Sequence, residues 1–460
     1  MEGFMETKPR EIVSDSEIRK NVLSMIIPVS IEGILQMISS TVLMAFLGRV
    51  DVLAVNAVGI GQRMTQLLWS FVKGMGVGIT VCVARDVGAK KTENLKITSI
   101  VGMLSLICIV IFFSGLIALF AEPIVRFFGG SEETIVQSID YMRIICIGLP
   151  FWTVMLCNAS VLQGFGDAKT PMVVSVIYNV VNIGLGYLLI FGGFGVPAFG
   201  LYGAAWATVI SQVLMCVLCI GIMLKKQIIT NMFHELTKSV SNTVAQLKYL
   251  YKISLPSAFE NMVWQLGSLA MMKPIISYGD IPYASHQLAM QAESISYMPT
   301  MGFGIATTSL VGRCFGAKDL ESGRKYFKRI AKYMAIITTT VMVIMVVFRK
   351  FLMGILTPSQ EIIDLGSIYL IITACTLIPQ NLHGVITGAL KGAGLTKPPM
   401  YISVICLWGI RVVLTYVFTY LVPGTTIHYV WISMSIDIVC RFLMSSTYYR
   451  KKKIFKNTAL

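Results

Sequence analysis

Long apolar runs recur along this chain and limit it to one kind of fold. Examples lie at residues 97–120, 172–191, 204–224, 333–348 and 401–421. Most of them approach the about 20 residues that a helix needs to cross a hydrocarbon core about 30 Å thick. Only 13% of the residues are charged, about half the share in a soluble protein. The sequence therefore predicts an all-α polytopic membrane protein.

Twelve spans are predicted from the apolar segments. They lie approximately at 22–47, 53–84, 97–120, 136–162, 170–194, 202–224, 250–278, 283–311, 330–348, 367–390, 398–421 and 426–448. Of the 38 Lys and Arg residues, 28 fall in the tails and the loops on one side, and four fall on the other. This imbalance predicts that both termini lie in the cytoplasm. It also explains the net charge of +15 without a nucleic-acid partner.

The chain contains an internal repeat with an offset of 228 residues. LQGFGDAKTPM (162–172) and LKGAGLTKPPM (390–400) agree at six of eleven positions. Pro28 and Glu32 match Pro256 and Glu260 at the same offset, and Tyr141 matches Tyr369. The repeat predicts two six-helix bundles in tandem, a 6+6 parallel arrangement, because an even number of helices gives both units one orientation.

This repeat sets the predicted domain organisation. The predicted parts are an N-terminal cytoplasmic tail at 1–21, a six-helix bundle at 22–224, a cytoplasmic linker at 225–249, a second six-helix bundle at 250–449 and a basic C-terminal tail at 450–460. Two similar bundles that rock against one another provide what alternating access requires, so a transporter is predicted. The sequence shows no phosphate-binding GxxxxGK[ST] loop and no catalytic constellation. We therefore expect neither an enzyme nor a cofactor, and an ion gradient would supply any energy.

Carboxylates within the spans are expensive and need an explanation. Glu32 lies about ten residues into the first predicted span, and Glu260 holds the equivalent place in the seventh. Each follows a proline by four residues, where a missing backbone N–H loosens the helix. Because burial disfavours the charged form, each is a candidate proton carrier. A hydrogen bond to a neighbouring helix is the alternative role for both.

Three further charged positions in the spans are candidates for binding or for structure. Glu293 is placed either to bind a cationic ligand or to pair with Lys273 or Arg63. Asp437 and Arg441 are four residues apart and are expected to neutralise each other. Arg411 is expected to hold Glu260 or Gln380 in place, to orient a substrate, or to serve the structure alone.

Several ordered motifs give the chain a family resemblance over nearly its whole length. They include LGRVDVLAVNAVGIG (47–61), YNVVNIG (178–184), LYGAAWATVISQ (201–212) and SHQLAMQAESISYMPTMGFGIATTSLVG (285–312). With the 6+6 repeat, they resemble the multidrug and toxic compound extrusion (MATE) family of secondary transporters. The resemblance implies export of amphipathic, often cationic compounds through a cleft between the bundles, in exchange for Na⁺ or H⁺. It implies a monomer in the plasma membrane.

The family's site residues carry over only in part. Leu43 stands where many members have a first-span aspartate, and Gly186 where some have a fifth-span one. Asn182 matches the fifth-span asparagine and Thr208 the sixth-span threonine, which leaves these two for any Na⁺ site of the N-terminal lobe. Gln380 stands where the tenth span would carry an acid.

Glu260 resembles the family's seventh-span glutamate and is the first choice for ion coupling, with Glu32 second. Glu293, Gln380, Asn182 and Arg411 are the predicted substrate-binding residues. The alternative function is a lipid-linked oligosaccharide flippase of the same superfamily, which would need a more basic central cavity.

Overall fold

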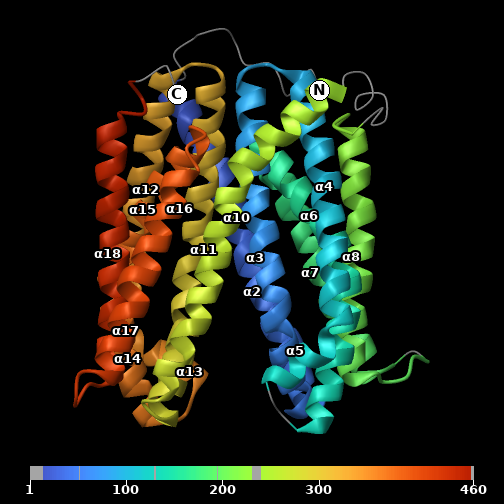
Figure 1. The fold of residues 1–460 in the computed structure, drawn as a ribbon, viewed down its shortest axis with the longest axis vertical. Coiled ribbons are helices and arrows are strands. Elements are labelled where there is room, and N and C mark those ends of the chain that lie inside the picture. The colour runs from blue at the N-terminus through green and yellow to red at the C-terminus, as the bar shows by residue number, and fades with distance from the viewer. Residues whose placement is uncertain (1–13, 51, 129–130, 194, 230–239, 457–460) are drawn as a thin grey trace. The chain divides into compact units, whose positions relative to one another are not determined.

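The structure, a computed structural model, describes residues 14–50, 52–128, 131–193, 195–229 and 240–456. Nearly all of this part of the chain is helical, and no strand forms within it. Figure 1 shows the helices. In the N-terminal half they are α2 (Asp15–Val50), α3 (Val52–Gly88), α4 (Thr92–Leu119), α5 (Ala121–Phe128), α6 (Glu132–Gly164), α7 (Lys169–Phe191) and α8 (Gly200–Lys225).

The C-terminal half repeats this order with two interrupted helices. Its elements are α10 (Val240–Ile276), α11 (Asp280–Gly316), α12 (Leu320–Val347), α13 (Arg349–Leu356), α14 (Gln360–Ala374), α15 (Leu377–Gly392), α16 (Lys397–Cys406), the π-helix η1 (Leu407–Val412), α17 (Val413–Tyr420) and α18 (Ile427–Lys452). The predicted tenth span is the pair α14–α15, bent by 46°. The predicted eleventh span is α16–η1–α17.

The predicted twelve-helix, two-repeat membrane fold is confirmed. Among the described residues, nine helices are by themselves long and apolar enough to span a membrane, and the bent pair α14–α15 makes a tenth. α10 and α11 are as long, at 37 residues each, but both carry more polar residues along their length, including Glu260 and Glu293.

Close contacts divide the chain into two compact units. Unit 1 contains Ile31–Ala258, and unit 2 contains the described residues up to Ser30 together with those from Phe259 onward. The first part of α2 therefore belongs to unit 2, and the first part of α10 belongs to unit 1. Both divisions follow Pro28 or Pro256 by two residues, so the exchange obeys the 228-residue repeat. Sequence-based boundaries at 22 and 250 place each helix wholly in one bundle.

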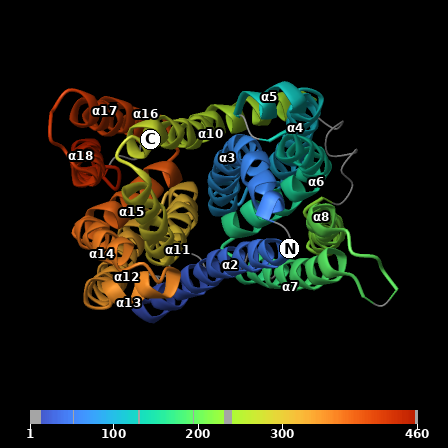
Figure 2. The ribbon, with the colours of Figure 1, turned by 90° about the horizontal axis from the view of Figure 1, so that it is seen from below.

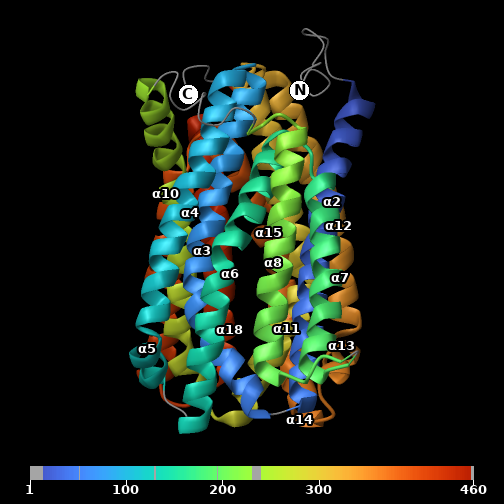
Figure 3. The same cartoon turned by 90° about the vertical axis from the view of Figure 1, so that its right-hand side faces the viewer.

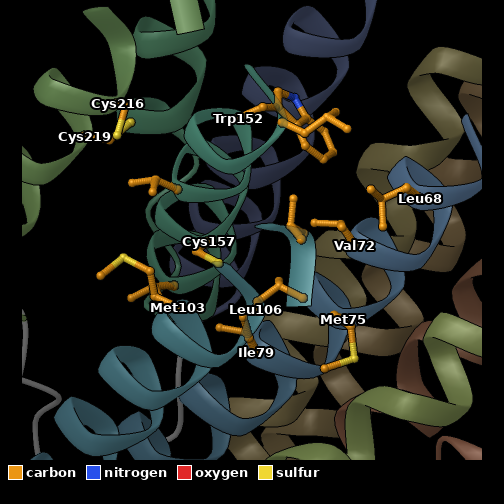
Figure 4. Close-up of a cluster of buried hydrophobic side chains, with 14 of the residues drawn as sticks. Leu68, Val72, Met75, Ile79, Met103, Leu106, Trp152, Cys157, Cys216 and Cys219 are labelled. Atoms are coloured by element: carbon orange, nitrogen blue, oxygen red, sulfur yellow. The ribbon is translucent and has the colours of Figure 1, made fainter. Parts of the chain in front are cut away.

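Unit 1 is built around α6. This helix packs against α3, α4 and α8 (Figure 2), and α7 lies beside α8 (Figure 3). The core in Figure 4 joins buried side chains from all four of the packed helices. They are Leu68, Val72, Met75 and Ile79 of α3, Met103 and Leu106 of α4, Trp152 and Cys157 of α6, and Cys216 and Cys219 of α8. The last two are free thiols that fill apolar space.

The start of α10 joins unit 1 through small residues. A Cβ atom on Gly74 would lie 2.3 Å from Ala258 Cα, and one on Gly78 would lie 2.5 Å from Ser254 Cα. The two glycines and the two α10 residues are each four apart, the small-xxx-small spacing that lets membrane helices approach closely. Glycine is therefore required at both positions of α3 for α10 to reach its place.

Replacing Gly78 by leucine should destabilise the protein by about 3 kcal/mol, the upper end for overpacking. A Cβ there meets Ser254 Oγ at 1.9 Å, so α3 and α10 must separate. The measurement is thermal unfolding in detergent. Gly59→Ala on the same helix is the matched control, because nothing lies within 4 Å of its Cβ position. Equal melting of the two variants would show that this contact does not hold unit 1 together.

The repeated loop motif forms the same turn in both halves. Gly166 and Gly394 have φ values of 82° and 81°, in the left-handed region that favours glycine. Asp167 caps α7, since it accepts hydrogen bonds from Thr170 N at 3.0 Å and Thr170 Oγ1 at 2.6 Å. Lys226 Nζ lies 2.9 Å from Asp167 Oδ2. Burial alone would raise the pKa of Asp167, but the Thr170 and Lys226 hydrogen bonds hold this pKa below its ordinary value.

Candidate functional site

Glu260 forms an ion pair inside unit 2. Lys391 Nζ of α15 lies 2.9 Å from Glu260 Oε2, and each of the two side chains is 16% exposed. Ser403 of α16 donates a hydrogen bond to Glu260 Oε1 at 3.1 Å. Glu260 is the 21st of the 37 residues of α10, so three helices meet at a carboxylate near the middle of a long helix.

A second charged centre joins η1 and α18. Asp437 is fully buried and contacts two guanidinium groups, Arg441 Nε at 2.7 Å and Arg411 Nε at 2.8 Å. Arg441 makes a second bond to it through Nη2, at 2.9 Å. Both guanidinium groups also lie over the ring of Trp264, at 4.7 and 4.9 Å from its centroid, within the range of cation–π attraction.

The position of Arg411 differs from the sequence-based expectation. The predicted pair Asp437–Arg441 is confirmed, but Arg411 joins this pair instead of contacting Glu260 or Gln380. The physical reason lies in η1, which contains Arg411. A π-helix closes its turns with one residue more than an α-helix, and this changes the direction in which Arg411 leaves the helix. Gln380 is half-buried in α15, and its Oε1 atom has no hydrogen-bond partner.

Glu293 has a tyrosine as its partner. Tyr369 donates its hydroxyl to Glu293 Oε2 at 2.5 Å, and the Tyr369 side chain is fully buried. His286 and Trp431 hold the tyrosine ring edge-to-face, with centroid distances of 5.7 and 5.3 Å. The expected partner Lys273 is exposed; the side chain of the other expected partner, Arg63, lies outside the described residues.

Glu32 belongs to unit 1 and has a different environment from its repeat partner. Its side chain is half-buried, and its Oε2 atom is buried without a hydrogen-bond partner. Lys73 of α3 is near enough to act electrostatically on it. The two matched glutamates thus each lie near a lysine, but only Glu260 forms a close ion pair.

The family's N-terminal cation site does not fit the residues present. Leu43 Cδ2 lies 2.4 Å from the position of a Cβ on Gly186, so a leucine side chain fills the space beside that glycine. Asn182 is buried with its Oδ1 unpartnered, whereas Thr208 donates to Ala204 O at 3.0 Å. One free amide oxygen without a carboxylate is a poor cation ligand set. The described residues contain no cluster of three His, Cys, Asp or Glu.

Sequence reasoning missed four partners: Lys391, Ser403, Trp264 and Lys73. One signal was available for the first of these. Within the repeated motif, Lys391 stands opposite Gln163, although Glu260 matches an identical Glu32. A charge that differs between halves, beside an acid that does not, indicates a partner for the acid in one half only. Counting Lys391 as a loop residue concealed this.

Two tandem sets of membrane helices with buried ion pairs at mid-span are the features of a two-repeat membrane transporter. The MatE family matches residues 28–188 and 256–417. The chain therefore belongs to the MATE family, and it is a transporter rather than an enzyme.

The chain resembles its relatives over almost its full length. It is 28% identical over 467 aligned residues to "Probable multidrug resistance protein NorM" of Thermotoga maritima, covering 99% of this chain and 97% of the relative. It is 26% identical to "Probable multidrug resistance protein YoeA" of Bacillus subtilis, covering 98% of each. A structure described as "Crystal structure of MATE in complex with MaL6" superposes with a TM-score of 0.87 at 19% identity, covering 96% of this chain and 98% of that one.

Proposed function

We propose that this chain is a secondary active multidrug exporter, which moves amphipathic, often cationic compounds out of the cell in exchange for H⁺ or Na⁺ by alternating access. The observation that carries the proposal is Glu260, a largely buried carboxylate at mid-helix that is matched by Glu32 in the repeat. Relatives aligned over nearly the whole chain are named as probable multidrug resistance proteins, which supports the substrate class.

Glu260 is the proposed coupling residue because its negative charge has an exchangeable partner. A proton or Na⁺ that binds Glu260 replaces the attraction of Lys391, so the ion pair between α10 and α15 breaks. The two helices then become free to change their packing. Loss of the ion restores the pair, and this alternation links ion binding to the conformation of unit 2.

The proposed setting is the plasma membrane, with both termini in the cytoplasm and the protein acting as a monomer. The excess of Lys and Arg on one side of the predicted spans supports this orientation. The coupling ion is the proposed inorganic partner, and no cofactor is required. Because a carboxylate is missing beside Asn182 and Thr208, we place coupling in the C-terminal half.

A flippase is the less favoured alternative. Recognition of a pyrophosphate-linked lipid needs accessible cations that face one cavity. Arg411 and Arg441 are each only 7% exposed and share Asp437, so neither is available for such a ligand in this structure.

The deciding experiment is ethidium efflux by the purified protein in liposomes, with an imposed pH gradient or an imposed Na⁺ gradient, one at a time. We expect one of the two gradients to drive efflux and its matching ionophore to stop it. Protein-free liposomes are the control. If neither gradient moves ethidium or a second cationic dye, the multidrug antiport proposal is wrong.

A further inference from the structure

Lys73 is an exposed cation in the middle of a membrane helix. It is the 22nd of the 37 residues of α3, and its side chain is exposed in this structure. No carboxylate among the described residues forms an ion pair with it, and Glu32 acts on it only electrostatically. Basic residues at this depth are costly and normally mark a binding or transport pathway.

The packing of α3 determines where Lys73 points. Gly74 and Gly78 face α10 at contact distance. Since successive residues turn by about 100° around an α-helix, Lys73 leaves α3 to one side of this contact. Its exposure shows that neither α10 nor the rest of unit 1 covers it.

Glu32 lies at nearly the same depth. It precedes the end of α2 at Val50 by 18 residues, and Lys73 follows the start of α3 at Val52 by 21. At about 1.5 Å per residue the two depths agree within about 5 Å. A half-buried acid with an unpartnered oxygen and an exposed base therefore lie at one level of unit 1.

The repeat shows that the fold does not need this lysine. SFVKGMGVGI (70–79) aligns with SYMPTMGFGI (296–305), which puts Pro299 opposite Lys73. The flanking Ser70, Met75, Gly76, Gly78 and Ile79 are identical in the other half. A cation that one half alone carries, between positions that both halves share, is better explained by a ligand than by helix packing.

We propose that Lys73 binds a free acidic group of the transported compound, and that Glu32 accommodates a positive charge on the same compound. This inference rests on the proposed export function and specifies its substrates as zwitterionic aromatic amphiphiles. A lysine ammonium and a carboxylate form a charge-assisted hydrogen bond, which gains strength where water is scarce. The nearby Glu32 disfavours compounds that carry negative charge alone.

The test uses two dyes that differ only at the acidic group: rhodamine 19, a zwitterion with a free carboxylate, and rhodamine 6G, its cationic ethyl ester. Binding to purified protein is followed by fluorescence anisotropy. Lys73→Gln should weaken rhodamine 19 binding about tenfold, as expected for a charge-assisted hydrogen bond, and leave rhodamine 6G unchanged. Lys73→Arg should retain rhodamine 19 binding. Glu32→Gln should weaken rhodamine 6G binding.

Lys273→Gln is the matched control, because Lys273 is an exposed lysine in the last turn of α10, and it should alter neither dye. Equal weakening of both dyes by Lys73→Gln would assign Lys73 a structural role and overturn the inference. Wild-type protein that binds and exports rhodamine 6G but ignores rhodamine 19 would overturn the inference and leave the export function standing. Failure to transport either dye would overturn both.

Discussion

Replacement of Glu260 by glutamine is expected to reduce gradient-driven efflux to the level of liposomes without protein. Glutamine keeps the size of the side chain and can still accept a hydrogen bond from Ser403. It can neither take up a proton nor attract Na⁺ or Lys391 as a charge. If ion binding at Glu260 controls the contact between α10 and α15, the variant has no group left to couple the gradient to movement of the substrate.

The effect on coupling has to be separated from an effect on stability. Glu260→Gln leaves Lys391 largely buried without its partner, and unpaired buried charges destabilise proteins. The double variant Glu260→Gln/Lys391→Met removes both charges, so it should recover the wild-type melting temperature without recovering efflux. Efflux is measured with the gradient that drives the wild type, and thermal unfolding is measured in detergent.

A matched control is available on the surface. Glu321 and Lys325 form an ion pair of the same length, 2.9 Å, with side chains 77% and 38% exposed. Glu321→Gln should leave both efflux and stability unchanged, because exposed ion pairs contribute little. Gradient-driven efflux at the wild-type rate by Glu260→Gln would refute the coupling role.

Replacement of Asp437 by asparagine is expected to cause the largest loss of stability. Asp437 is 0% exposed and is bound by both Arg411 and Arg441. The substitution leaves two buried guanidinium groups that share only the ring of Trp264. Breaking a buried ion pair on one side costs about 3–5 kcal/mol, and here a single carboxylate serves two cations. Thermal unfolding in detergent and the yield of folded protein in membranes measure the effect.

Asp364→Asn provides the comparison for this second variant. Asp364 and Lys350 form a 2.8 Å ion pair with side chains 51% and 62% exposed, and its loss should change the melting temperature little. The triple variant Asp437→Leu/Arg411→Met/Arg441→Met replaces the whole centre by apolar side chains and should recover much of the stability. Wild-type melting of Asp437→Asn would mean that the two arginines are solvated in the folded protein, contrary to their burial.

The sequence by itself determined the fold class and the repeat. A helix that crosses hydrocarbon needs about 20 apolar residues, and this requirement is local, so it can be read from each segment alone. The 228-residue offset followed from LQGFGDAKTPM and LKGAGLTKPPM, and it identified Glu32 and Glu260 as a matched pair. The contact between Asp437 and Arg441 was also predictable, because residues four apart share one face of any helix.

The tertiary structure alone decided which groups meet across helices. Lys391 on Glu260, Arg411 on Asp437 and Tyr369 on Glu293 each join residues of different helices, and so does Leu43 against Gly186. Such contacts depend on the rotation of each helix about its axis and on the helix packed against it. Small residues such as Gly74 and Gly78 set that packing, and η1 alters the rotation locally. No apolar run encodes these quantities, and the exchange of the first parts of α2 and α10 between the units became visible only in three dimensions.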